Sequence, residues 1–129
     1  MSGTLLKYVL ILAGGGVGSV ARYVASNAVT HRFGSRYPVG VMSVNVTGCF
    51  LIGLVMTFLA ERYAGDTNWR LLLVTGFLGG YTTFSSFEWE VYFDLHKGAW
   101  WPALVNVAGS VILGLAAVWL GSSVARRWA

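Results

Sequence analysis

Four long runs of apolar residues, joined by short connections, constrain what this chain can fold into. The runs cover residues 5–29, 40–60, 71–93 and 100–124, and the second and fourth contain no charged residue. Each reaches the roughly 20 residues that a helix needs to cross the hydrocarbon core of a bilayer. Only 11% of the 129 residues are charged, which is too few to solvate an ordinary globular surface. The sequence therefore predicts an all-α membrane protein, a single domain over residues 1–129 with four transmembrane helices surrounded by membrane lipid.

Lysine and arginine are spread almost evenly over the two ends of such a chain. An excess of these residues on the cytoplasmic side normally sets the orientation of a membrane protein. With both termini on one side, five lie on that side and four on the other, so we expect insertion in both orientations. The first set is Lys7, Arg62, Arg70, Arg126 and Arg127, and the second is Arg32, Arg36, Lys97 and, if its side chain extends that way, Arg22.

Aromatic side chains mark the ends of the predicted spans. Tryptophan and tyrosine favour the headgroup level of a bilayer, where an apolar ring with a polar edge is best accommodated. The borders of the four spans are therefore indicated by two independent signals, hydropathy and aromatic position. The residues concerned are Tyr8, Tyr37, Tyr63, Trp69, Trp100, Trp101 and Trp128.

Three features of the sequence suggest other classes of protein. In each case the residues that such a class would also need are absent from the sequence. The net charge of +4 comes from scattered basic residues instead of a stripe, so nucleic acid is not an expected partner. A dinucleotide-binding outline, Gly16-x-Gly18-x-x-Ala21, has no acidic residue before Glu61, although such a site needs one about 20 residues on. A single cysteine, Cys49, excludes an internal disulfide. We therefore do not expect an enzyme. The glycines of the first run instead predict close approach of another helix, as small residues four apart do in membranes.

Uncharged hydrogen-bonding residues lie inside three of the four runs. Singly, such a residue most often forms an interhelical hydrogen bond, which contributes about 0.6 kcal/mol. At comparable depth in three spans, these residues together suggest a narrow polar track. Amide and hydroxyl donors, with no lysine or arginine in mid-span, suit a small anion that accepts hydrogen bonds strongly. The residues are Asn45 in the second run, Ser85 and Ser86 in the third, and Asn106 and Ser110 in the fourth.

The third run contains the stretch TGFLGGYTTFSSFEWE, residues 75–90, which is unusual for a membrane helix. Phe84 and Phe87, three residues apart, share a helical face, and their positive ring edges would attract an anion; plain packing is the alternative. Two glycines and two threonines near mid-span predict a helix break. Freed carbonyls at that depth cost several kcal/mol each unless they are bound, and in transporters such carbonyls bind sodium. Two chains paired in opposite orientations would bring the break against its own copy and share one cation site.

These residues resemble a known family. The stretches GFLGGYTTFSSF, SVNVTG, VNVAGS and GGGVGSVARY are similar to the Fluc (CrcB) fluoride channel family over essentially the whole chain. The resemblance implies an antiparallel, dual-topology homodimer with two pores that exports fluoride passively from microbes. The implied location is the plasma (inner) membrane, as a multi-pass protein. It also implies a structural sodium ion at the dimer interface, held by main-chain carbonyls at the positions of Gly79 and Thr82.

The same resemblance implies roles for individual side chains. Phe84 and Phe87 match the pore phenylalanines, Asn45 the pore asparagine, and Ser110 the serine of the polar track in the last span. The implied fluoride pore also includes Thr83, Ser85 and Asn106.

Three charged residues of the spans need separate interpretation. Glu90 matches an acid that the family often has after the second phenylalanine, whereas Glu88 stands where a serine is usual. An unpaired charge within a membrane is costly, so we expect Glu88 to pair with an arginine; facing water or titrating are the alternatives. Arg22 could attract anions to an aqueous mouth, which would be a functional role. It could instead pair with one of these glutamates or extend to the lipid headgroups, and we favour these two structural roles.

Two functions from other classes remain as alternatives. A small, dual-topology, proton-coupled multidrug exporter has the same outline and would need a membrane carboxylate, for which Glu88 and Glu90 are the candidates. A structural subunit without transport of its own is the third possibility.

Overall fold

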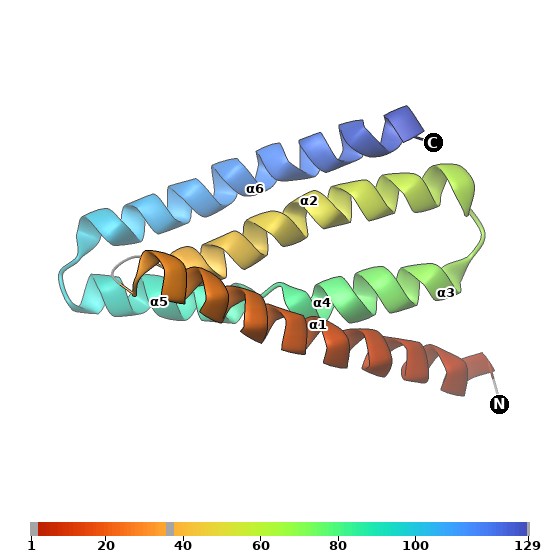
Figure 1. Ribbon diagram of the computed structural model, residues 1–129, viewed down its shortest axis with the longest axis horizontal. Helices are drawn as coiled ribbons and strands as arrows, with labels where there is room; N and C mark the ends of the chain where they lie inside the picture. Colours follow the sequence, from red (N-terminus) through yellow and green to blue (C-terminus); the bar gives the residue numbers. More distant parts are fainter. Residues whose placement is uncertain (1–2, 36–37, 129) are drawn as a thin grey trace.

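Three long helices and one interrupted crossing make up the chain (Figure 1). The computed structural model describes residues 3–35 and 38–128, and these form helices without a strand. Arg36 and Tyr37, used above in the charge count and the aromatic borders, lie outside the described residues. The long helices are α1 (Gly3–Phe33), α2 (Val39–Arg62) and α6 (Trp100–Trp128). Each is long and apolar enough to cross a membrane, judged by length and composition.

The interrupted crossing corresponds to the predicted span 71–93. It consists of α3 (Thr67–Trp69), the π-helix η1 (Arg70–Leu78), α4 (Gly79–Tyr81) and α5 (Phe84–His96). The helices extend beyond the apolar runs because a helix need not end at the hydrocarbon border. The two ends of the bundle are clear in Figure 1: α1 begins, α6 ends and α2 connects to α3 at the same end. This is the arrangement on which the charge count depends.

Glycines allow the helices to pack backbone against backbone. A Cβ atom on Gly53 of α2 would overlap the Val118 carbonyl of α6, and one on Gly18 of α1 would overlap the Phe77 carbonyl of η1. Gly14, four residues before Gly18, is in the same situation against Leu72. The predicted close approach through the glycines of the first run is therefore confirmed. The partner of α1 is the interrupted crossing itself.

The break in the third crossing is confirmed, but it lies on the threonines and not on the glycines. Gly79 keeps helical angles of φ −62° and ψ −35°, whereas Thr82 is extended at φ −88° and ψ 158°. The Thr82 hydroxyl donates to the Leu78 carbonyl at 2.9 Å, and Thr83 caps α5 by accepting from Ser86 N at 3.2 Å. Threonine competes with the helix through such local bonds. The glycines serve packing instead, since a Cβ on Gly80 would overlap the Gly15 carbonyl.

Candidate functional site

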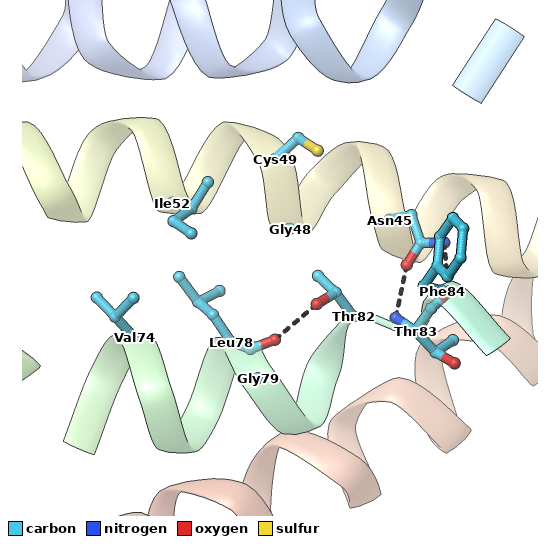
Figure 2. A pocket seen from close by; sticks show the side chains of 10 residues that line it. All are labelled: Asn45, Gly48, Cys49, Ile52, Val74, Leu78, Gly79, Thr82, Thr83 and Phe84. Atoms are coloured by element: carbon cyan, nitrogen blue, oxygen red, sulfur yellow. Dashed lines mark hydrogen bonds between the residues drawn. The ribbon is translucent and has the colours of Figure 1, made fainter. Parts of the chain in front are cut away.

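The side chain of Asn45 is bound to the break. Its Nδ2 donates to the Thr83 carbonyl at 2.9 Å, and Thr83 N donates to Asn45 Oδ1, also at 2.9 Å (Figure 2). The amide therefore satisfies both backbone groups of Thr83, which an uninterrupted helix would have satisfied with its own backbone. The sequence placed Asn45 in the polar track but gave no sign of this pair, because the two residues are 38 positions apart.

Carbonyls just before the break lose their helical donors. In a continuous helix each carbonyl accepts from the N–H four residues later, so Thr83 N would bond Gly79 and Ser86 N would bond Thr82. Here Thr83 N donates to Asn45, and Ser86 N donates to the Thr83 hydroxyl. The carbonyls of Gly79 and Thr82, the two positions that the resemblance implies for sodium, are thus among those released, because the break also separates Gly80 and Tyr81 from the residues four positions later.

A cavity of about 340 Å³ adjoins both residues. Gly79 and Thr82 line it together with Asn45, Cys49 and Phe84, as Figure 2 shows. Released main-chain carbonyls at membrane depth suit a sodium ion. The residues present therefore fit the cation that the sequence suggested.

Hydroxyl groups gather at the start of α5. The Thr83 hydroxyl donates to Ser86 Oγ at 3.1 Å and lies 3.4 Å from Ser85 Oγ. Thr83 and Ser86 also line a cavity of about 380 Å³ with Arg22 of α1. Three side chains predicted from the track, Asn45, Thr83 and Ser85, are therefore brought together at the break.

Arg22 and Glu88 do not form the ion pairs expected of them. Among the described residues neither has an ion-pair partner, and Glu88 is exposed on α5. Arg22 instead lies beside the cavity lined by Ser19, Ser26, Thr83 and Ser86. A cation at a cavity lined by hydroxyls raises the local concentration of anions. The ion-pair alternative is thus not seen for Arg22 among the described residues, and its position suits both attraction of anions and contact with the headgroups.

Phe84 and Phe87 face each other as their spacing predicted. Their ring centroids are 5.9 Å apart with an interplanar angle of 43°. Their surroundings differ, because Phe84 is 74% exposed and lines the cavity at the break, whereas Phe87 is only 7% exposed. Phe87 packs with Val91 and Ala103, which joins α5 to α6. Packing and a role toward an ion are both compatible with Phe87, while packing within the chain does not explain Phe84.

The remaining predicted residues form a second polar group, between α5 and α6. Ser110 donates to Asn106 Oδ1 at 3.2 Å, and Asn106 is only 1% exposed. Asn106 Nδ2 and Glu90 Oε2 are buried and have no hydrogen-bond partner among the described residues. Phe87 connects the two groups, since it touches Phe84 and packs on Ala103, three residues before Asn106.

Comparison with known proteins gives consistent matches over nearly the whole chain. Residues 9–122 match the family model described as CrcB-like protein, Camphor Resistance (CrcB). A protein of Solibacter usitatus named fluoride-specific ion channel FluC is 60% identical over 122 residues, covering 95% of this chain and 100% of the relative. Proteins of the same name from Acidobacterium capsulatum and Coxiella burnetii are each 43% identical. They cover 95% of this chain and are themselves covered over 98% and 99% of their lengths.

Proposed function

The chain belongs to the CrcB family and is a fluoride channel, and we propose that it lets fluoride leave the microbial cell passively across the plasma membrane. The observation that carries this proposal is the polar group at the break, where uncharged donors, Asn45 and Thr83 among them, lie beside Phe84. The proton-coupled exporter is not favoured, because the relatives are named as channels. The chain is not an enzyme.

Uncharged donors suit the passage of fluoride. Fluoride is tightly hydrated, so a pore must replace its water with donors of similar strength and still release the ion. A fixed cation in a narrow, dry segment would hold the ion too strongly. In our proposal the hydroxyls at the start of α5 and the ring edges of Phe84 and Phe87 replace water in steps. Asn106 and Ser110 continue the track along α6. Asn106 Nδ2 is a buried donor that has no hydrogen-bond partner among the described residues.

The experiment that tests the function uses purified channel in vesicles loaded with fluoride. An ion-selective electrode is expected to record rapid fluoride release without any proton gradient, and no comparable release of chloride. Glu90→Gln serves as the test of proton coupling, since a coupled exporter would lose its transport while a passive channel would still release fluoride. Vesicles that fail to release fluoride would contradict the proposal.

Two copies in opposite orientations would complete the pore. The exposed ring of Phe84 and the open cavity at the break lie near the middle of the crossing, where an axis in the membrane plane would place a partner's copy. The almost even distribution of lysine and arginine supports equal insertion both ways.

A single cysteine near the end of α6 can test dual orientation. In a Cys49→Ser background, a membrane-impermeant thiol reagent is expected to label about half of the Arg127→Cys chains in intact cells, because the even charge distribution sets no preference. All chains should react after permeabilisation. Labelling of all or none of the chains in intact cells would show one fixed orientation and rule out antiparallel pairing.

We also propose that the released carbonyls of Gly79 and Thr82, contributed by both copies, hold one sodium ion. Removing sodium by dialysis against N-methylglucamine is expected to lower fluoride release at least tenfold, since freed carbonyls without a cation cost several kcal/mol. Returning sodium should restore it. Unchanged release after exhaustive removal would mean that these carbonyls need no cation.

A further inference from the structure

Two adjoining hollows lie between the end of α2 and the start of the interrupted crossing. One is an apolar groove of about 250 Å³, lined by residues such as Val55, Phe58 and Leu73. The other is a more polar pocket of about 320 Å³ that includes Asp66 and Arg70. The two hollows share Leu59 and Tyr63. An apolar groove that continues into a charged pocket has the amphipathic character of a lipid molecule.

The charged pocket has a cation available for a ligand. The Arg70 side chain makes no hydrogen bond or ion pair with the residues that the structure describes. The nearby Asp66 carboxylate is engaged locally, because its Oδ1 accepts from Asn68 N at 2.9 Å. Arg70 is therefore not neutralised by that acid through a direct contact.

The surroundings of the pocket are also basic. Arg62 Nη2 donates to the Trp128 carbonyl at 3.4 Å, which ties the end of α6 to the end of α2. Arg126 and Arg127 lie in this last turn of α6. Arginines thus outnumber carboxylates at this end of the bundle, and an anionic group would be attracted there.

The depth of the two hollows matches the layers of a membrane. Tyr63 and Trp69, which line the groove, are about half exposed, and such rings mark the headgroup level. Val55 and Leu73 lie further into the apolar spans, whereas Arg70 lies at the border. We propose that one anionic phospholipid binds here, with an acyl chain in the groove and its phosphate beside Arg70. A soluble anion would leave the groove unused, and a zwitterionic lipid would gain less from the basic surroundings.

Native mass spectrometry of the purified channel with equimolar phosphatidylglycerol and phosphatidylcholine tests the headgroup. The intact channel is expected to retain phosphatidylglycerol about fivefold more strongly, which is the preference that one interfacial arginine provides. Arg70→Gln should abolish the preference. Arg127→Gln removes the same charge at the same end of the bundle but outside the pocket, and it should keep the preference. Equal retention of both lipids by the intact channel, or an unchanged preference in Arg70→Gln, would overturn the proposal.

A second variant tests the groove. Val55→Trp fills the groove without altering Arg70, and it is expected to lower phosphatidylglycerol retention about fivefold. Glycerol 3-phosphate, which offers the phosphate without a chain, should not displace the lipid at equal concentration. Displacement by glycerol 3-phosphate, or full retention in Val55→Trp, would show that the groove takes no part. Fluoride release by each variant confirms that it is folded, because both positions lie away from Asn45 and Phe84.

Discussion

Replacing Phe84 or Phe87 by isoleucine is expected to lower fluoride release from vesicles at least tenfold, the effect of losing about 1.4 kcal/mol of stabilisation of the passing ion. Isoleucine keeps an apolar side chain but lacks the positive ring edge that would face fluoride. At Phe84, which is exposed and lines the cavity, the fall in fluoride release should occur without a large loss of stability. At Phe87, which is buried against Val91 and Ala103, some loss of packing is expected in addition.

A matched control separates the ring edges from general packing. Phe77 lies in the same crossing and stacks on Tyr81 at 5.8 Å, away from the polar groups of the site. Phe77→Ile should leave fluoride release within about twofold of the original, because it alters packing without removing a ring edge from the cavity at the break. Size-exclusion chromatography of all three variants reports assembly. Normal release by both Phe84→Ile and Phe87→Ile, with assembly intact, would remove the ring edges from the mechanism.

Asn45→Ala is expected to damage both stability and transport. The substitution leaves the N–H and the carbonyl of Thr83 without their partners, and each unsatisfied group costs about 1–3 kcal/mol. The free energy of unfolding should therefore fall by roughly 2–6 kcal/mol. Fluoride release should fall at least tenfold, because the segment that carries Phe84 and the hydroxyls loses its fixed position. Denaturant unfolding in detergent and electrode recordings measure the two effects.

Thr57→Val provides the comparison for Asn45. Thr57 also lies on α2, and its hydroxyl donates to Ser122 of α6 at 2.8 Å, but it is remote from the break. Loss of such an interhelical hydrogen bond costs about 0.6 kcal/mol on average, and fluoride release should be unaffected. If Asn45→Ala proves no more costly than Thr57→Val, the two bonds to Thr83 do not hold the break.

Local patterns predicted the features that depend on local properties. Hydropathy gave the three long helices, the spacing of Gly14 and Gly18 gave the close contact of α1, and a three-residue interval gave the contact of Phe84 with Phe87. The break lies within the predicted group of two glycines and two threonines, on the threonines. The glycines remain helical and a neighbouring helix requires the small size of Gly80, whereas the threonines offer alternative hydrogen bonds.

The missed interactions are those between helices. The bonds of Asn45 to Thr83 and the hydroxyl-lined cavity around Arg22 depend on how each helix is rotated about its axis. That rotation follows from the packing of glycines against distant carbonyls, which no short stretch of sequence encodes. For the same reason, the ion pairs expected of Arg22 and Glu88 are not found among residues 3–35 and 38–128.

The amide that completes the break belongs to the same polypeptide as the break itself. Each newly made subunit therefore satisfies the backbone groups of Thr83 without help from a partner. If pairing then joins finished molecules from two oppositely inserted pools, its rate is proportional to the product of the two populations. That product is greatest when the two pools are equal. An even distribution of basic residues, which favours neither orientation, would therefore make the pairing of subunits fastest.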